Sequence, residues 1–258
     1  MPELPEVETM SRQLQKHISG KEITGMDIYD SKLAHIKNLT GIIITDVKRN
    51  GKAIQIILDN GESVLIHLRM TGRLLWQKES EKPRYSRWHL SLSNCNIYLV
   101  DPRRFATVKV LPTNSIPSAN DIMQGGFDEK AFIEKQGRRI INIKNLLMDQ
   151  KAIAGIGNIY ACEILHAACI NPERTATSIT DKEWKRIFSK SRSILEKATE
   201  KRGTSISDWR DLYGLEGENQ FVLKVYGREG KKCFRCGGTI VRIKQGGRST
   251  YYCPNCQK

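Results

Sequence analysis

The order of hydrophobic and polar residues divides the chain into regions of different secondary structure. Near the start, apolar residues recur every three or four positions, which is the spacing of one face of a helix. This stripe consists of Val7, Met10, Leu14 and Ile18. Pro5 suits the first turn of such a helix, and Ser19-Gly20 suits its end. The pattern predicts an N-terminal helix that buries the stripe and holds the chain start in place.

After this helix the apolar residues form short runs separated by turn residues, which is typical of strands. Eight such runs lie at residues 23–29, 41–49, 53–58, 63–68, 73–76, 88–92, 96–100 and 107–111. Asp59-Asn60-Gly61 has the composition of a hairpin turn between two of them. Eight short strands after one helix predict a β-sandwich or a barrel.

Between Pro112 and Ala119 the composition shifts to Pro, Ser, Asn and Thr, which is typical of a linker. Beyond it the apolar spacing is helical again. Helices are expected at residues 128–135, 143–149, 158–168, 181–200 and 205–213. The sequence therefore predicts an α+β protein with an N-terminal helix and sandwich over residues 1–115, a helical domain over 116–225 and a small Cys-rich unit over 226–258.

The charge of the chain narrows the choice of partner. Lys and Arg number 42 against 28 Asp and Glu, giving a net charge of +14. This excess indicates a polyanionic partner, most simply nucleic acid, although a ribosomal or membrane-surface protein could carry it too. No stretch reaches the roughly 18 apolar residues of a membrane span, and the start has no signal-peptide pattern. We expect a cytoplasmic protein that does not bind a membrane.

Four of the seven Cys residues form two Cys-x-x-Cys pairs, Cys233 with Cys236 and Cys253 with Cys256. In a reduced compartment this spacing favours metal over disulfides. Four thiolates suit one structural, tetrahedral Zn²⁺ without an open position for catalysis. Between the pairs, residues 239–245 and 249–252 flank Gly246-Gly247 as a β-hairpin, with Arg248 at its tip. An arginine at such a tip is usually a phosphate contact.

The first residues, Met1-Pro2-Glu3-Leu4-Pro5-Glu6, offer an unusual nucleophile. An initiator Met is removed before a small residue, which would leave Pro2 as a secondary amine. An α-amino group has a pKa of roughly 7.7–8.0 against roughly 10.4 for lysine, and its addition to an aldehyde carbon gives an iminium. Glu3 could shuttle protons, and Glu6 lies one helical turn further on. The same residues also fit an ordinary helix start, where proline and carboxylates are favoured.

The run Met-Pro-Glu-Leu-Pro-Glu-Val-Glu-Thr resembles the N-terminus of the formamidopyrimidine-DNA glycosylases, which use an N-terminal proline as nucleophile. Further similarities follow in the family's order through the sandwich turns, a helix junction and the Cys-rich unit. The resemblance implies a monomeric repair enzyme that acts on double-stranded DNA containing oxidised bases or abasic sites. It would hold the duplex across a basic cleft between two domains, flip out oxidised purines such as 8-oxoguanine and formamidopyrimidines, and cut the strand by β,δ-elimination.

The resemblance also implies roles for residues in three turns. Lys52, in a turn where a lysine is usually solvated, would donate a proton during elimination. Met70 could wedge into the base stack, because an enzyme that extrudes a base needs something to fill the gap. Arg103 and Phe105 lie on the same side of an extended chain and would fill the gap and contact the orphaned base. Without the family, a core Met and a solvated Arg pair are the better interpretations.

The run Gly155-Ile156-Gly157-Asn158-Ile159-Tyr160-Ala161-Cys162-Glu163 is a Gly-rich turn that opens a helix, which suits a phosphate. It resembles the helix-two-turns-helix element with which the family grips the DNA backbone. Asn158 is the expected phosphate contact, and Arg138 and Arg139 are expected to touch phosphate as well. For Arg248 the resemblance implies a second role, in which it assists the second elimination.

Two places depart from the family pattern. Tyr85 stands where many relatives carry a DNA-contacting His, and it is kept as a DNA-binding candidate because its hydroxyl can donate a hydrogen bond. The loop over residues 213–221, polar and Gly-bearing as a mobile lid would be, would close over the extruded base. It reads Glu218-Asn219-Gln220 instead of an aromatic-Gln pair.

Two alternatives remain. The first is an endonuclease VIII-type glycosylase for oxidised pyrimidines, against which Leu4, Arg103 and Phe105 speak. The second is a catalytically silent nucleic-acid-binding zinc protein. Retention of Met1 would block the nucleophile and favour this second alternative.

Overall fold

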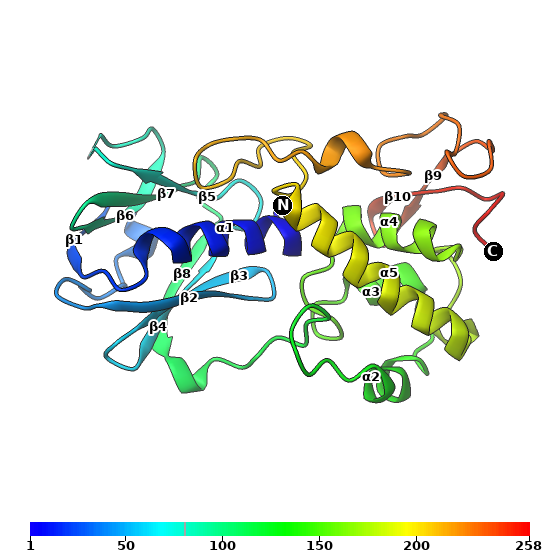
Figure 1. The fold of residues 1–258 in the computed structure, drawn as a ribbon, viewed down its shortest axis with the longest axis horizontal. Coiled ribbons are helices and arrows are strands. Elements are labelled where there is room, and N and C mark those ends of the chain that lie inside the picture. The colour runs from blue at the N-terminus through cyan, green and yellow to red at the C-terminus, as the bar shows by residue number, and fades with distance from the viewer. Residues whose placement is uncertain (80) are drawn as a thin grey trace. The chain divides into compact units, whose positions relative to one another are not determined.

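A computed structural model gives the structure of residues 1–79 and 81–258 (Figure 1). The chain divides into two compact units. The first consists of Met1–Ser118 and Thr199–Gln220, and the second of Ala119–Ala198 and Phe221–Lys258. The sequence prediction kept residues 116–225 in one helical domain, whereas the structure assigns Thr199–Gln220 to the unit of the sandwich. The contacts of this returning segment with the first helix, described below, explain the difference.

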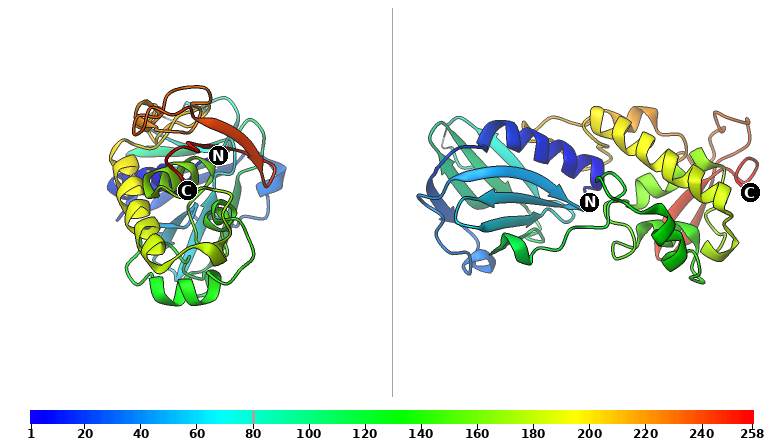
Figure 2. Two further views of the ribbon diagram at one scale, coloured as in Figure 1. Left: turned by 90° about the vertical axis from the view of Figure 1, so that its right-hand side faces the viewer. Right: turned by 60° about the horizontal axis from the view of Figure 1, so that its bottom comes forward.

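The first unit has one helix and eight strands, as the sequence predicted, and the strands form two four-stranded antiparallel sheets. Helix α1 spans Leu4–Ile18, and the sheet orders are β1-β6-β7-β5 and β2-β3-β4-β8. The strands are β1 (Ile23–Ile28), β2 (Ile44–Asn50), β3 (Ala53–Leu58), β4 (Glu62–His67), β5 (Arg73–Gln77), β6 (Ser86–Leu92), β7 (Cys95–Val100) and β8 (Thr107–Pro112). Figure 2 shows in its right-hand view how α1 runs along the twisted sheets.

Helix α1 enters the core through the apolar stripe that the sequence predicts. Val7, Met10, Leu14 and Ile18 are all fully buried and join strand residues such as Ile54 in one hydrophobic cluster. Full burial of one such side chain stabilises a fold by about 1.5–3 kcal/mol. The stripe therefore fixes the helix, and with it the start of the chain, on the sandwich.

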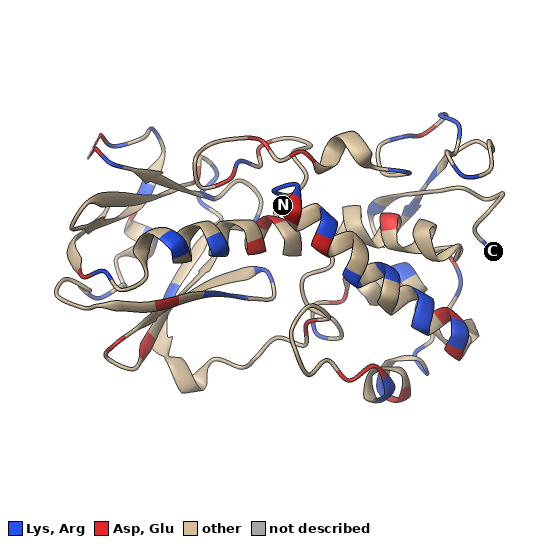
Figure 3. Ribbon diagram, viewed as in Figure 1, with Lys and Arg blue, Asp and Glu red and all other residues tan. Residues whose placement is uncertain are grey.

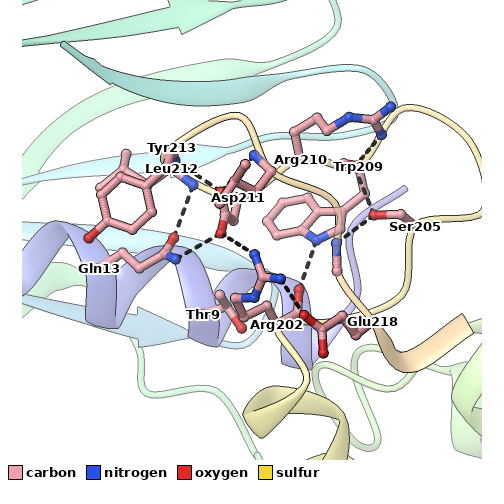
Figure 4. A network of polar contacts seen from close by, with 12 residues as sticks. Thr9, Gln13, Arg202, Ser205, Trp209, Arg210, Asp211, Leu212, Tyr213 and Glu218 are labelled. Atoms are coloured by element: carbon pink, nitrogen blue, oxygen red, sulfur yellow. Dashed lines mark hydrogen bonds and ion pairs between the residues drawn. The ribbon is translucent and has the colours of Figure 1, made fainter.

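A second, polar stripe of α1 binds the segment that returns to the first unit. Glu6, Thr9, Gln13 and His17 lie three or four positions apart, and each contacts this segment. The Gln13 amide donates to Asp211 Oδ2 (3.1 Å) and its carbonyl accepts from the Leu212 N–H (3.0 Å; Figure 4). Thr9 Oγ1 donates to the Thr199 carbonyl, Glu6 accepts from the Thr204 N–H, and His17 Nε2 lies 2.7 Å from the Tyr213 hydroxyl.

The helix expected over residues 205–213 is wrong, because this stretch forms turns and extended chain. Its backbone groups bond to side chains instead of to a helical ladder. Ser205 Oγ donates to the Trp209 carbonyl (2.9 Å), and the Asp211 carboxylate accepts from the Tyr213 N–H (3.0 Å). Local side-chain acceptors of this kind compete with helix formation.

The second unit is helical and ends in a hairpin. Its helices are α2 (Glu129–Gln136), α3 (Ile143–Met148), α4 (Asn158–Ala168) and α5 (Asp181–Glu200), and its strands are β9 (Val241–Gln245) and β10 (Arg248–Tyr252). Short 3₁₀ turns lie at Ser31–Leu33, Thr113–Ser115, Ala176–Ser178 and Asn219–Val222. Among the described residues, no helix has the combination of length and apolar character that a membrane crossing requires.

Charge is unevenly distributed along the second unit. Its last stretch, residues 221–258, carries nine Lys and Arg and a single acidic residue, Glu229. Figure 3 shows these basic positions along β9, β10 and the loops beside them. Such a concentration of positive charge around a hairpin suits a polyanion.

Candidate active site

The start of the chain is braced by the Glu6 carboxylate. Glu6 Oε2 accepts the Glu3 N–H at 2.7 Å, and Glu6 Oε1 accepts the Thr204 N–H at 2.7 Å. Both Pro2 and Glu3 are buried. Gly203 allows this close approach, because a Cβ atom there would lie 2.7 Å from Glu6 Oε1. Glu6 thus joins the chain start to the returning segment and fixes the residue next to Pro2.

Lys52 lies in the turn between β2 and β3, as predicted, but it is buried rather than solvated. The turn is tied to α1 through Arg49, whose Nε donates to Glu8 Oε2 (2.8 Å) and whose Nη1 donates to the Gly51 carbonyl (3.1 Å). Burial raises the pKa of Glu8, but the charges and hydrogen bonds of Arg49 and Arg12 outweigh it and lower the pKa overall. The ion pair therefore fixes the Lys52 turn relative to helix α1, which begins two residues after Pro2.

The charge state of His67 depends on its burial and on the cationic side chains near the Lys52 turn. It pairs with Ala53 across β3 and β4, next to Lys52. Burial and then the charges of Arg69 and Lys52 lower the pKa of His67 to about 4. His67 is therefore neutral at pH 7, and its Nδ1 accepts the Arg69 N–H (3.0 Å).

Met70, Arg103 and Phe105 lie on two surface loops of the first unit. Met70 is 48% exposed and Phe105 is 46% exposed, so neither side chain belongs to the core. The Arg103 guanidinium lies 4.8 Å from the centre of the Phe105 ring. The expected extended chain is wrong here, because residues 102–103 form a turn and Arg104 is left-handed (φ 57°). The turn nevertheless brings the arginine and the ring together.

Tyr85 is a second exposed aromatic residue of the first unit. Half of its surface is accessible, its φ is 65°, and the Arg84 guanidinium lies 4.6 Å from its ring centre. Its carbonyl accepts the Asp101 N–H (3.1 Å), which places its backbone beside the loop of Arg103. The ring is accessible to a polyanionic ligand together with an arginine.

In the second unit, Asn158 opens α4 directly after the Gly-rich turn. Its amide donates to the Ser249 carbonyl of β10 (2.9 Å), while its Oδ1 has no hydrogen-bond partner among the described residues. Gln150 holds the turn by accepting the Gly155 N–H (3.0 Å) and donating to the Ile156 carbonyl (2.7 Å). The amide of Asn158 is therefore oriented by the hairpin.

The three predicted phosphate-binding arginines differ in their contacts. Arg139 pairs with Asp149 (2.8 Å) and Gln136 (3.0 Å), whereas Arg138 is exposed. Arg248 is also exposed and begins β10 directly after the Gly246-Gly247 turn. Arg248 belongs to the second unit, whereas Pro2, Glu3, Glu6 and Lys52 belong to the first.

The four predicted zinc ligands converge. The sulfur atoms of Cys233, Cys236, Cys253 and Cys256 all lie within 4.8 Å of one another. The Cys233–Cys256 and Cys236–Cys253 sulfur distances are 3.9 and 3.4 Å, close to the edge of about 3.8 Å that follows from Zn–S bonds of about 2.3 Å in a tetrahedron. Four thiols without a water position fit one closed, structural zinc ion.

Two side chains of helix α4, His166 and Glu163, contact the zinc unit. His166 Nε2 lies 3.4 Å from the Cys233 sulfur, and the Glu163 carboxylate accepts the N–H groups of Lys224, Val225 and Tyr226 at 2.9 Å each. Hydrogen bonds from the surroundings orient metal ligands and adjust the metal site. The helix that begins at Asn158 and the zinc hairpin therefore form one supported structure.

Three family models match the chain. The formamidopyrimidine-DNA glycosylase N-terminal domain matches residues 1–108, the formamidopyrimidine-DNA glycosylase H2TH domain matches residues 119–209, and a zinc finger found in FPG and IleRS matches residues 230–258. The formamidopyrimidine-DNA glycosylase of Pelotomaculum thermopropionicum is 42% identical, over 100% of this chain and 99% of the relative. The chain belongs to the formamidopyrimidine-DNA glycosylase family.

Solved structures of this glycosylase family share the fold. Lactococcus lactis Fpg in complex with DNA containing an abasic site has a TM-score of 0.90 and 31% identity, over 99% of each chain. MutM in complex with DNA containing carbocyclic 8-oxo-G has a TM-score of 0.88 and 32% identity, over 100% of each chain. The fold predicted from the sequence and the four zinc ligands of this glycosylase are thus confirmed, while the roles of Pro2, Glu3, Lys52 and the DNA-contacting residues stay predictions.

Several residues that organise this glycosylase's site were missed from the sequence. The missed positions are side chains that support the predicted residues: Glu8 bonded to Arg49, Asp211 bonded to Gln13, Glu163 bonded to the Lys224 N–H, and His166 beside the Cys233 sulfur. The one signal in the sequence that could have revealed such contacts is a polar stripe on α1. Its members are Glu6, Thr9, Gln13 and His17, each of which directly precedes a residue of the apolar stripe. The loop over residues 213–221, expected to be a mobile lid, is bonded through Leu215 to Asp211 (2.9 Å) and through Gly217 to Ser205 Oγ (2.9 Å).

Proposed function

We propose that this protein excises oxidised purines, namely 8-oxoguanine and formamidopyrimidines, from double-stranded DNA and then cuts the strand at the abasic site. The observation that carries the proposal is the Pro2-Glu3 terminus, held by Glu6, within a chain that matches glycosylases over its whole length. The thiols of the zinc site suit a reducing compartment such as the cytoplasm, and we expect the protein to act there as a monomer.

The reaction begins after removal of Met1, which frees the Pro2 amine. The amine attacks the anomeric carbon of the flipped nucleotide and forms a C–N bond, while the glycosidic bond breaks and the base leaves with a proton. The sugar ring then opens: the bond between the anomeric carbon and the ring oxygen breaks, the oxygen takes up a proton, and the nitrogen becomes a cationic iminium. The iminium acidifies the neighbouring C–H group, so its proton is lost and the 3′ phosphate is expelled. A second elimination expels the 5′ phosphate and leaves a one-nucleotide gap. Glu3 moves protons at the sugar.

Lys52 and Arg248 act on the eliminations in this proposal. Lys52 is buried and is fixed by the Arg49–Glu8 ion pair, which suits a proton donor that must keep one position. Arg248 is exposed at the hairpin and meets the charge that develops on the departing phosphate. The zinc ion holds the two ends of the segment that carries Arg248.

Binding of the duplex rests on two groups of residues. Met70, Arg103 and Phe105 fill the gap in the stack and contact the orphaned base, because all three side chains extend from surface loops. Asn158, Arg138, Arg139 and Tyr85 contact the DNA backbone, and the positive end of the α4 dipole favours a phosphate beside Asn158. Affinity should fall steeply as salt rises, because phosphate contacts release counterions.

The proposal is tested by comparing excision from duplexes that contain either 8-oxoguanine or thymine glycol opposite their normal partners. We expect faster release of 8-oxoguanine, followed by cuts on both sides of the lesion. Faster release of thymine glycol would favour the endonuclease VIII type. Tight binding without release of either base, by protein whose mass shows that Met1 is absent, would favour a silent DNA-binding protein.

A further inference from the structure

One buried carboxylate joins the two loops that carry Met70, Arg103 and Phe105. The Asp101 side chain has no exposed surface. Its Oδ1 accepts the Thr71 hydroxyl (2.5 Å) and the Arg103 N–H (3.2 Å). Its Oδ2 accepts the N–H groups of Phe105 and Ala106, each at 2.7 Å. Each of these four donors is a proposed gap-filling residue or a direct neighbour of one.

The two loops also touch directly, and both have unusual backbone conformations. A Cβ atom on Gly72 would lie 2.4 Å from the Leu68 carbonyl and 2.8 Å from Ala106 Cβ, so the two loops meet without space for a side chain. Arg69 and Arg104, one in each loop, are left-handed with φ of 58° and 57°. Such conformations cost free energy and persist only where the surroundings fix them. Asp101 bonds to Arg103 and Phe105 on either side of Arg104 and to Thr71 in the other loop, whereas the Arg69 N–H is bonded to His67.

A second set of charged side chains, those of Arg87, Asp30 and Arg104, lies next to Asp101. Arg87 Nη1 lies 3.4 Å from Asp101 Oδ2 and donates to the Ala106 carbonyl (2.7 Å). Arg87 and Arg104 both pair with Asp30, which is as buried as Arg87. Burial raises the pKa of Asp101, but hydrogen bonds from Ala106, Thr71 and Phe105 outweigh it and lower the pKa. The carboxylate is therefore ionised at neutral pH and compensated on all sides.

We propose that Asp101 is a positioning residue for base extrusion, holding the Met70 loop and the Arg103–Phe105 loop as one rigid body. The inference rests on the proposed function, because it assumes that these side chains fill the gap in the stack. Both loops must enter the same gap at the same time, so their relative position matters more than that of either alone. Loss of Asp101 should therefore affect only substrates in which a gap in the base stack must be filled and an opposite base must be contacted.

The test replaces Asp101 by Asn, which keeps the shape but puts an NH₂ group against N–H or hydroxyl donors. Excision of 8-oxoguanine opposite cytosine should fall by about 10- to 100-fold, the loss expected when a reacting group is misplaced by about 1 Å. Cutting of a preformed abasic site in single-stranded DNA should stay within about twofold, because no gap needs filling there. Asp208→Asn, an exposed carboxylate of the same unit, is the matched control and should change neither rate.

Thr71→Val removes only the bond between the loops and leaves the buried charges intact. It should lower duplex excision in the same selective way but less than Asp101→Asn does. Thr45→Val is its control, because Thr45 lies at an exposed position of β2 and would lose a bond to the Ile57 carbonyl of β3. Equal losses on duplex and single-stranded substrates, or full duplex activity in Thr71→Val, would overturn the inference.

A binding measurement separates this inference from the proposed function. The probe is a duplex with a tetrahydrofuran abasic analogue placed opposite cytosine or opposite a second abasic analogue. Asp101→Asn should lose affinity about tenfold or more for the first duplex and keep it for the second. If the unmutated protein binds both duplexes but excises nothing, the proposed function fails while the ratio of affinities still decides the role of Asp101. An unchanged ratio contradicts that role.

Discussion

Replacing Glu6 by Gln should destabilise the first unit and slow the reaction. Both Glu6 oxygens accept a buried backbone N–H at 2.7 Å, one from Glu3 and one from Thr204. A glutamine can accept only one of them, because its NH₂ group must face the other N–H. A buried donor left unsatisfied costs about 1–3 kcal/mol, and a bond to a charged acceptor contributes about 1.5–3 kcal/mol. We therefore expect a loss of about 2–3 kcal/mol in the free energy of unfolding.

The assay is urea unfolding of the processed protein, followed by the single-turnover rate of excision. Excision should slow by about tenfold or more, because Glu6 fixes the residue next to Pro2, the proposed nucleophile. Glu62→Gln is the control, since Glu62 pairs with the half-exposed Lys37 and its replacement should change neither quantity measurably. Unfolding and excision of Glu6→Gln that both match the unmutated protein would refute the argument.

Three further predictions follow from the same contacts. Gly203→Ala should destabilise the protein more than Gly20→Ala in urea unfolding, because both residues are left-handed (φ 81° and 78°) but only at Gly203 would the Cβ meet Glu6; equal losses would contradict this. The pKa of Glu8 is lowered from its usual 4.5, so its pair with Arg49 stabilises the fold above that pH and is lost as the pH falls below it; acid unfolding of Glu8→Gln should lack this part of the pH dependence. A chelator should release one Zn²⁺ per chain and abolish duplex binding, while Cys95→Ser should leave the zinc content unchanged in metal analysis, since Cys95 is buried in the first unit.

Much of the fold follows from local sequence pattern. The stripe from Val7 to Ile18 has a helical period, and the eight apolar runs are bounded by turn residues, so both can be predicted without knowledge of long-range contacts. The zinc site is equally local, since two Cys-x-x-Cys pairs on either side of a hairpin specify it. The helix, the strands and the zinc site could be predicted because each is specified by residues close together in sequence or by one apolar face.

What could not be predicted depends on partners distant in sequence. The stretch over residues 205–213 has a polar pattern that fits a helix, but Gln13, about 200 positions earlier, competes for its backbone. Asp101 looks like an ordinary turn residue until Thr71, thirty positions away, is brought to its carboxylate. The side chains of Asp101 and Asp211 are both fully buried. Each carboxylate accepts hydrogen bonds from several donors that come together only when the chain folds.

In the proposed function, the amine of Pro2 forms a covalent bond with the sugar of a damaged nucleotide. Borohydride reduction during the reaction with a duplex containing 8-oxoguanine opposite cytosine would trap this iminium, and peptide mapping would locate it. We expect an adduct on the N-terminal peptide at Pro2 and none with Pro2→Gly or with protein that retains Met1. An adduct on Lys52 instead, or no adduct from processed protein that binds the duplex tightly, would contradict it.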